Sequence, residues 1–247
     1  MKVRGDEFGL VWQTPLKQRA QLQRSAPSLP PTDWQPPGEF PTLQGCKRIC
    51  VDVETCDPGL ADLGPAVRRG GYIVGLAVGT DYGFRGYYPI RHQGGGNIDE
   101  SLVLGWARAE LNSYSGIVVG AKLLYDLEYL ANEGVTFPNV KRFHDVQVAE
   151  ALLDEHRLQY NLDSLAWDYL GESKVDETLA KAARAFGFGS KPRDVKENLW
   201  RLPASYVGTY GEGDVDLPLR IIELQYAKLK EQDLLDLFDL ESRLIPM

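Results

Sequence analysis

The chain has few of the residues that hold small secreted domains or zinc sites together. Its 247 residues include three histidines and only three cysteines, Cys46, Cys50 and Cys56. An odd number of cysteines with no histidine near them argues against a disulfide framework and against the spacing of a zinc site. We therefore expect free thiols that are buried or partly buried.

Long apolar runs and a surplus of positive charge are also missing. The sequence contains no stretch of about 18 apolar residues, and its first ten residues lack the apolar core of a secretory signal. We expect no membrane partner and a cytoplasmic location. The net charge of -8 argues against a protein that binds duplexes by neutralising phosphates. It fits a protein that gathers carboxylates around divalent cations.

The first 45 residues differ in composition from the rest of the chain. They are rich in proline and glutamine and include "SAPSLPPTDWQPPGEFP", which cannot propagate a helix and offers little to bury. We expect residues 1–45 to form a proline-rich extension, either an extended arm or a flexible leader. The remainder, in a chain that is 43% hydrophobic, has enough apolar material for one main domain.

From Arg48 onward, short apolar strands alternate with helical patterns. Strands are predicted at 48–54, 71–80, 83–90, 116–120 and 141–145. Helices are predicted at 101–114, 123–134, 146–156, 162–171 and 175–187, with a flexible turn at 187–194. A long helical region follows from Pro203, and Pro218 is expected to bend or divide it. This order predicts an α/β fold in which helices cover a mixed sheet.

Two acidic residues stand on one face of the first predicted strand. Side chains at i and i+2 of a strand point the same way, so Asp52 and Glu54 project together. Val51 and Val53 then face the opposite layer. Two like charges this close are costly unless a cation lies between them, which points to a hard divalent ion. A solvated strand end with two unpaired acids explains the pair equally well.

Further acidic residues occur where an α/β sheet usually presents functional groups. Asp126 lies near the start of the helix that follows the wholly apolar strand. Asp214 follows Tyr210 by four residues, a spacing that places the phenol and the carboxylate on one helix face. Taken singly, each acid fits a surface residue better than a metal ligand. Glu212 and Asp216 lie on other faces, and we expect them to be solvated charges.

Three motifs in a fixed order carry a resemblance to a known family. The stretches "VDVET", "GAKLLYDLEYL" and "YGEGDVD" resemble the exonuclease motifs of the proofreading domain of family A DNA polymerases. The texture of "GPAVRRGGYIVGLAVGTD" and "YYPIRHQGGGN" is similar to the bacteriophage members, which implies the cytoplasm of a host cell. The resemblance runs from about Arg48 to the C-terminus. It implies a ribonuclease H-like fold and a 3'-5' exonuclease of the Asp-Glu-Asp-Asp class whose third motif carries tyrosine.

The resemblance also implies roles for the residues of the site. Asp52, Glu54 and Asp214 would bind one of two divalent metal ions, Mg²⁺ or Mn²⁺. Asp52 would also bind the second ion, and Asp126 would act on it through ordered water. Tyr210 would orient the attacking water, because a phenol with its ordinary pKa of about 10 is a poor base at neutral pH.

Two residues are expected to contact the substrate. Thr55 matches a family position that contacts the terminal nucleotide. Lys122 stands where the second motif normally has asparagine, and its ammonium group would either repel a metal cation or contact a phosphate. A lysine that merely extends into solvent is the alternative. Weaker candidates for phosphate contacts near the entrance are Arg68, Arg69, Arg91 and His92.

The chain is shorter than the family pattern requires. In the family, the exonuclease domain precedes a much longer polymerase domain, and nothing in this sequence matches one. We expect residues 46–230 to form the exonuclease domain and residues 231–247 to begin a helical connection toward an absent polymerase domain. The chain is then a fragment without polymerase activity.

Together the motifs predict an enzyme that releases nucleoside monophosphates from single-stranded or frayed DNA 3' ends during polymerase proofreading. One alternative is a non-catalytic DNA-binding or scaffold module of a polymerase. The presence of all four acids argues against it. A second alternative is an exonuclease that trims RNA with the same metal chemistry. The resemblance of the C-terminal end to a polymerase connection favours DNA.

Overall fold

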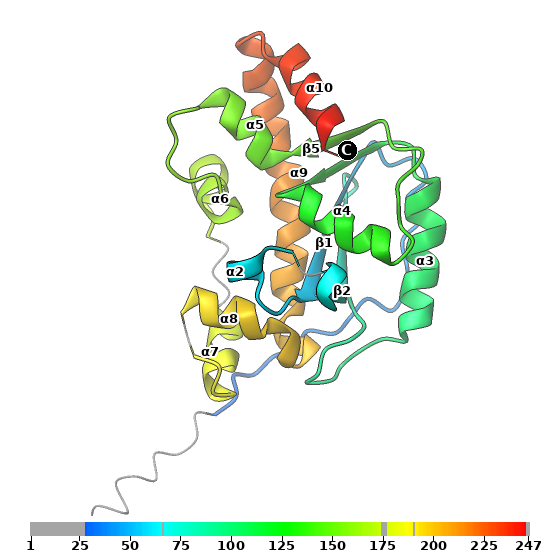
Figure 1. Cartoon of the computed structure of the whole chain (residues 1–247), viewed down its shortest axis with the longest axis vertical. Helices are drawn as coiled ribbons and strands as arrows, with labels where there is room; N and C mark the ends of the chain where they lie inside the picture. The colour runs from blue at the N-terminus through cyan, green and yellow to red at the C-terminus, as the bar shows by residue number, and fades with distance from the viewer. Residues whose placement is uncertain (1–27, 66, 174–176, 190, 246–247) are drawn as a thin grey trace, which may run out of the picture.

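A computed structural model describes residues 28–65, 67–173, 177–189 and 191–245 of the chain. Its centre is one mixed sheet of five strands in the order β3-β2-β1-β4-β5. β1 is antiparallel to β2 and β2 to β3, whereas β1, β4 and β5 run parallel. The strands are β1 (Arg48–Cys56), β2 (Tyr72–Thr80), β3 (Arg85–Pro89), β4 (Ile117–Gly120) and β5 (Arg142–Asp145). The mixed α/β sheet predicted from the sequence is confirmed (Figure 1).

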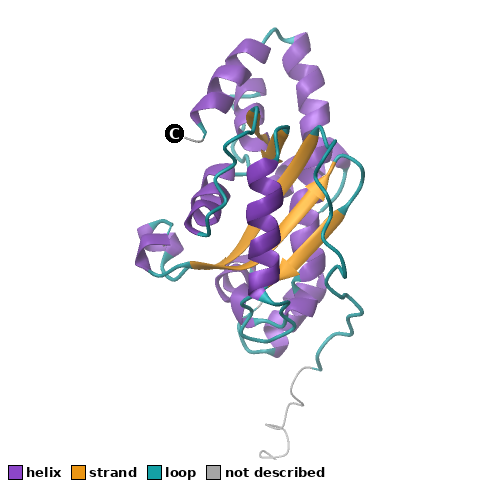
Figure 2. Cartoon of the chain, turned by 90° about the vertical axis from the view of Figure 1, so that its right-hand side faces the viewer, coloured by secondary structure: helices purple, strands orange, loops and turns teal. Residues whose placement is uncertain are grey.

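Helices cover both faces of this sheet (Figure 2). α3 (Glu100–Ser113) and α4 (Leu123–Asn132) cover one face. The long helix α9 (Gly208–Glu231) covers the other and packs against α5 (Val146–Leu153) and α6 (Leu162–Leu170). The remaining helices are α2 (Leu60–Leu63), α7 (Glu177–Ala185), α8 (Pro192–Asn198), α10 (Leu235–Leu244) and the short 3-10 turns η1 (Val67–Arg69), η2 (Leu199–Arg201) and η3 (Ala204–Tyr206). Among the described residues, no helix combines the length and apolar character needed to cross a membrane.

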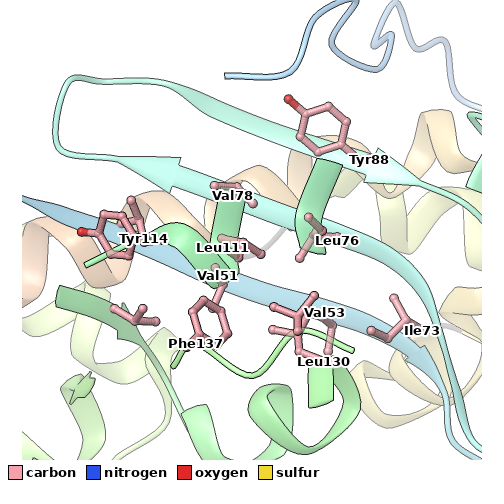
Figure 3. Close-up of a cluster of buried hydrophobic side chains, with 14 of the residues drawn as sticks. Val51, Val53, Ile73, Leu76, Val78, Tyr88, Leu111, Tyr114, Leu130 and Phe137 are labelled. Carbon is pink, nitrogen blue, oxygen red and sulfur yellow. The ribbon is translucent and has the colours of Figure 1, made fainter. Parts of the chain in front are cut away.

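The alternation of side chains along β1 divides the core into two layers. Val51 and Val53 lie in one cluster with Leu111 of α3 and Leu130 of α4 (Figure 3). Cys50 lies in the other cluster, on the α9 side of the sheet. Because the side-chain period of a strand is two, this arrangement turns the acidic positions of β1 toward α9.

The C-terminal helical region differs from the sequence prediction. α9 runs through Pro218 without interruption; the 3-10 turn η3 precedes it, and residues 232–234 separate it from α10. A proline removes the N–H that would bond the carbonyl four residues earlier, which is that of Asp214. The Cys50 thiol donates to this carbonyl at 3.8 Å, so the orphaned acceptor is satisfied from β1. Cys46, Cys50 and Cys56 are all buried free thiols, as predicted.

The described part of the proline-rich extension, residues 28–45, contains no helix or strand and lies against the domain (Figure 1). Phe40 stacks on Tyr88 and Trp106, with ring centroids 5.1 and 5.3 Å apart. Leu43 is almost fully buried. These contacts identify residues 28–45 as a packed arm and exclude a flexible leader over that stretch. The proposed domain boundaries at 46 and 230 stay predictions.

Because two histidines are buried, we predict that the stability of the fold decreases at acidic pH. Burial lowers the pKa of His92 and of His144 to about 4, against 6.5 in their unperturbed state. As the pH falls below 6.5, the two histidines bind protons in the unfolded chain, whereas in the folded chain they stay neutral until about pH 4. The free energy of unfolding should therefore fall in this window, by about 1.4 kcal/mol per pH unit for each histidine. Urea titrations at several pH values would measure it.

A substitution pair separates this effect from general acid denaturation. His144 packs on the ring of Phe238 at 4.8 Å, so His144→Phe should fit the same aromatic site and flatten the pH dependence. His156→Gln, at an exposed histidine, is the comparison substitution. Equal slopes in the wild type and in His144→Phe would show that His144 does not contribute.

Candidate active site

The candidate site lies where β1 extends beyond its parallel neighbour. Pairing of β4 with β1 ends at Cys50, and the strand continues for six residues to Cys56. Asp52 and Glu54 occupy this extension, which still pairs with β2 on its other side, and both are partly buried. One carboxylate oxygen each of Asp52, Glu54 and Asp214 lie within 4.8 Å of one another. The structure thus brings together acids that are about 160 residues apart in the sequence.

Asp126 enters the same site from α4. Its Oδ1 accepts a hydrogen bond from the Val53 N–H at 3.1 Å, and the side chain is buried. This N–H belongs to the part of β1 that β4 does not pair with. α4 can reach it because the chain turns directly from β4 into the helix through Ala121 and Lys122. The carboxyl end of a parallel strand thus presents the acid, as the sequence predicted.

Tyr210 and Asp214 share one face of α9, one turn apart, as their spacing predicted. Both line the two cavities at the end of β1. Asp214 is buried and Tyr210 is partly buried. All five residues predicted to be catalytic therefore meet at one place, and their individual roles stay predictions.

The electrostatics of the site favour a bound cation. Burial is the largest cause that raises the pKa of Asp126 well above its usual range, followed by the negative charge of Asp52. Glu54 and Asp214 add to the shift. A divalent cation among these oxygens would offset the repulsion, and carboxylates are the ligands that Mg²⁺ and Mn²⁺ prefer. The donor set therefore fits such an ion.

Two adjoining cavities open at the acidic cluster. The smaller, of about 230 Å³, includes Glu54, Thr55, Leu60 and Tyr125 in its lining. The larger, of about 850 Å³, extends toward α5, α6 and α8, and its polar lining includes Gln147, Tyr160, Asn161 and Asp163. Asp52, Asp214 and Tyr210 line both cavities, so the cluster lies at their junction.

Thr55 reaches the smaller cavity because β1 is irregular at that point. The register with β2 shifts between Glu54 and Thr55, which breaks the alternation of side chains. The Thr55 hydroxyl lies 2.6 Å from the Tyr125 hydroxyl, which in turn donates to Asp57 Oδ2 at 2.9 Å. The threonine predicted to contact the terminal nucleotide is thus held at the cavity wall.

Two lysines flank the cluster. Lys122 lines both cavities, is exposed, and places its Nζ 5.6 Å from the centre of the Tyr125 ring. Its backbone is left-handed, with φ of 65°, a conformation that asparagine adopts more readily than other non-glycine residues. Lys196 of α8 lines both cavities too. Lys196 was missed because no helix was predicted between the turn at 187–194 and Pro203, although Pro192 at a helix start is a known initiation signal.

Asp145 was also missed. Its Oδ2 accepts the Leu123 N–H at 2.8 Å and its Oδ1 accepts the Gln147 N–H at 2.8 Å. This one carboxylate fixes the starts of α4 and α5, and α4 carries Asp126. A capping aspartate directly before a predicted helix was the available signal.

The weaker phosphate candidates do not reach the site. Arg91 is held by Glu133 and Glu100, at 2.6 Å from each. His92 is buried, with its Nε2 2.5 Å from the Tyr87 hydroxyl. Arg68 and Arg69 are not among the described residues that line the cavities. The predicted phosphate role of Arg91 and His92 is therefore wrong, because tertiary partners occupy both side chains.

The expectation that Glu212 and Asp216 are merely solvated is also wrong. Glu212 Oε1 accepts the Trp34 Nε1–H at 3.1 Å, and burial raises the pKa of this carboxyl. Asp216 forms ion pairs with Arg85 at 2.6 Å and Arg220 at 3.1 Å. The helix period predicted their faces correctly but not their distant partners.

Comparison with known proteins identifies the relatives of the chain. No model of a known protein family matches the sequence. Over 222 residues the chain is 40% identical to a DNA-directed DNA polymerase of Pseudomonas phage M6, a match that covers 87% of this chain and 32% of that protein. The chain is a homologue of phage DNA polymerases. DNA polymerase DpoZ of Salmonella phage PMBT28 is 28% identical over 207 residues, covering 84% of this chain and 31% of that protein.

The resemblance drawn from the three motifs is therefore confirmed, and the chain spans about a third of the length of these relatives. Among solved structures, NrnC of Brucella melitensis with bound Mg²⁺ is similar, with a TM-score of 0.55 at 14% identity. The match covers 84% of this chain and 86% of that protein. This likeness concerns the fold, and it confirms the predicted ribonuclease H-like architecture.

Proposed function

We propose that this chain is a metal-dependent 3'-5' exonuclease that releases nucleoside monophosphates from single-stranded or frayed DNA 3' ends. The observation that carries the proposal is the convergence of Asp52, Glu54 and Asp214 within 4.8 Å, beside the buried Asp126. This cluster occurs in a homologue of phage DNA polymerases. The proposed task is proofreading, with a polymerase domain as the partner.

The acids would hold two divalent metal ions, Mg²⁺ or Mn²⁺. Asp52, Glu54 and Asp214 would bind one ion, and Asp52 with Asp126 would hold the other. When bound, such a pair lowers the pKa of water and stabilises the oxygen that leaves in a phosphoryl displacement. The Mg²⁺ bound by NrnC, a protein with the same fold, supports this choice of ion.

The residues around the acids would place the substrate. The Tyr210 hydroxyl would orient the attacking water from its position at the junction of the cavities. The oxygen of that water bonds to phosphorus, the bond from phosphorus to the 3' oxygen breaks, and the leaving oxygen takes up a proton. Lys122 and Lys196 would offer positive charge to the phosphates on either side.

The two cavities suggest a direction for the strand. Thr55 lines the smaller cavity, so we place the terminal nucleotide there. The larger cavity, with its amide and phenol groups, would take the preceding nucleotides. In this scheme only an unpaired strand end enters the two cavities. The ease with which a 3' end separates from its complement would therefore determine which substrates are cut.

A 5'-labelled oligonucleotide tests the proposal. With Mg²⁺ or Mn²⁺, single-stranded DNA should give a ladder that shortens one nucleotide at a time from the 3' end, and EDTA should stop it. A fully paired blunt end should be cut more slowly than a mismatched one. Faster cleavage of RNA than of DNA would favour the RNA-trimming alternative. Binding of the strand without cleavage in either metal would favour a scaffold role.

Lys122→Asn is predicted to raise activity at limiting magnesium, where metal binding limits the rate and the phosphate contact of Lys122 does not. The substitution removes a cation beside the proposed metal site and suits the left-handed backbone at this position. The magnesium concentration that gives half the maximal rate should fall by about threefold to tenfold, because one nearby repulsive charge is lost. Rates measured across a magnesium titration would show this. Lys122 makes no difference to metal binding if the two titration curves coincide.

A further inference from the structure

The first turns of α9 have little intrinsic stability. Gly208, Gly211 and Gly213 stand within six residues, and each glycine makes a helix less stable than alanine would. No described side chain caps the helix start at Val207. This same segment carries both α9 residues of the candidate site. Something other than helix propensity must therefore hold it.

Two aromatic rings from elsewhere in the chain lie against two of these glycines. A Cβ added at Gly208 would overlap the indole ring of Trp34, and one added at Gly211 would lie 2.6 Å from Cδ2 of Tyr87. The Trp34 and Tyr87 rings also contact each other, with centroids 6.0 Å apart. A Cβ at Gly213 would meet no described atom within 4 Å. The first two glycines thus mark where rings approach the helix backbone.

Trp34 also bonds α9 through its polar atom. Its Nε1–H donates to Glu212 Oε1 at 3.1 Å in a partly buried contact. The indole therefore touches α9 at Gly208 and at Glu212, one turn apart. Tyr210 lies between these two contacts. The indole therefore packs against the segment of α9 that carries this residue.

The arm on either side of Trp34 is anchored to the domain. Thr32 Oγ1 donates to the Ser205 carbonyl at 2.9 Å, and the Tyr206 hydroxyl donates to the Pro30 carbonyl at 3.1 Å. These bonds join the arm to η3, directly before α9. Further along, the stack of Phe40 with Tyr88 and Trp106 fixes the other side. Trp34 is thus held in place from both directions.

We propose that Trp34 is a positioning residue that holds the Tyr210 end of α9 in the conformation used for cleavage. The inference rests on the exonuclease function proposed above, which assigns Tyr210 and Asp214 their roles. It gives the packed arm, residues 28–45, a part in the reaction although none of its residues lines the two cavities.

Hydrogen exchange tests the contact without any reference to activity. In the wild type, local opening of the segment 208–214 has to break the indole contacts. Trp34→Ala lacks these contacts, so opening costs less free energy and amides 208–214 should exchange about tenfold faster or more. Amides of α3 and of the second half of α9 should exchange as in the wild type, at a temperature well below each unfolding midpoint. Trp34→Phe, which retains a ring, should restore most of the protection.

A matched pair of glycine substitutions distinguishes position from general stability. Gly208→Ala places a methyl group where the indole lies and should reproduce the effect of Trp34→Ala. Gly213→Ala makes the same chemical change on the same helix, in open space, and should protect the segment slightly because alanine favours helix. The two variants thus differ only in whether Trp34 is displaced.

Cleavage kinetics of a single-stranded oligonucleotide supply the second measurement. Trp34→Ala and Gly208→Ala should lower kcat by about tenfold or more with KM nearly unchanged, since a misplaced group costs rate more than binding. Trp34→Phe should recover most of kcat, and Gly213→Ala should match the wild type. A kcat of Trp34→Ala equal to that of the wild type would overturn the inference. Hydrogen exchange in Trp34→Ala that rises equally in α3 and in both halves of α9 would also overturn it. If the wild type cleaves nothing, the proposed function fails, and the exchange pattern alone decides whether Trp34 holds this segment.

Discussion

Replacing Asp52 by asparagine is expected to lower the rate of DNA cleavage by at least about a thousandfold, which corresponds to about 4 kcal/mol of transition-state stabilisation. The Asp52 carboxylate lies at the junction of the two cavities and within 4.8 Å of oxygens of Glu54 and Asp214. It is the acid that would contact both ions in the proposed site. Asparagine keeps the shape of the side chain and removes the charge.

The same substitution should leave the fold intact. Asp52→Asn removes one of several negative charges that lie close together. In the absence of metal, its unfolding midpoint should therefore lie between that of the wild type and a value about 2 °C higher. Added Mn²⁺ should raise the midpoint of the wild type, because a ligand that binds only the folded state stabilises it. This rise should be much smaller in the variant. Thermal unfolding with and without Mn²⁺, beside single-turnover cleavage rates, measures both effects.

Asp233→Asn is a suitable control for Asp52→Asn. It makes the same chemical change at an exposed position beyond the other end of α9, where φ is 59° and asparagine is well tolerated. Its cleavage rate and its response to Mn²⁺ should match the wild type. Asp52 is not a metal ligand if Asp52→Asn keeps more than about a tenth of the wild-type rate, since loss of a ligand costs far more.

The acidic cluster could be predicted because local geometry fixes most of it. The period of a strand places Asp52 and Glu54 on one face, and the period of a helix does the same for Tyr210 and Asp214. Asp126 follows a buried parallel strand, where such sheets present functional groups. Each of these rules uses only a few neighbouring residues. What the residues could not show by themselves was that the three segments meet, and the order of the motifs supplied that.

The failures involve partners that are distant in the sequence. Arg91 looked free to bind phosphate, yet Glu133 and Glu100 hold it in ion pairs. The proline-rich stretch appeared to have little to bury. The indole of Trp34 packs where Gly208 has no side chain, and the sequence around Trp34 does not indicate this contact. Contacts of this kind depend on packing between segments, for which a single sequence has no local signal.

Gly94→Ala is expected to reduce the free energy of unfolding by about 3 kcal/mol or more, the cost of forcing atoms into a closely packed site. A Cβ at this position would lie 2.5 Å from the Leu202 carbonyl carbon and would overlap the backbone nitrogen of Pro203. The loop cannot simply move away, because the Gln93 N–H bonds the Trp200 carbonyl at 2.9 Å and the Ala204 N–H bonds the Gly95 carbonyl at 3.0 Å. Denaturant titrations would measure the loss.

Gly105→Ala is the matched control, since Gly105 is exposed on α3 and a Cβ there would meet no described atom within 4 Å. It should be neutral or stabilise the protein by about 0.5–1 kcal/mol. A Gly94→Ala variant as stable as the wild type would mean that the chain from η2 to η3 can shift freely. That result would also weaken the argument that the start of α9 is held rigidly, because this same segment leads into it. If the loop contributes only to stability, the cleavage rate of Gly94→Ala should equal that of the wild type when it is measured well below the unfolding midpoint of the variant.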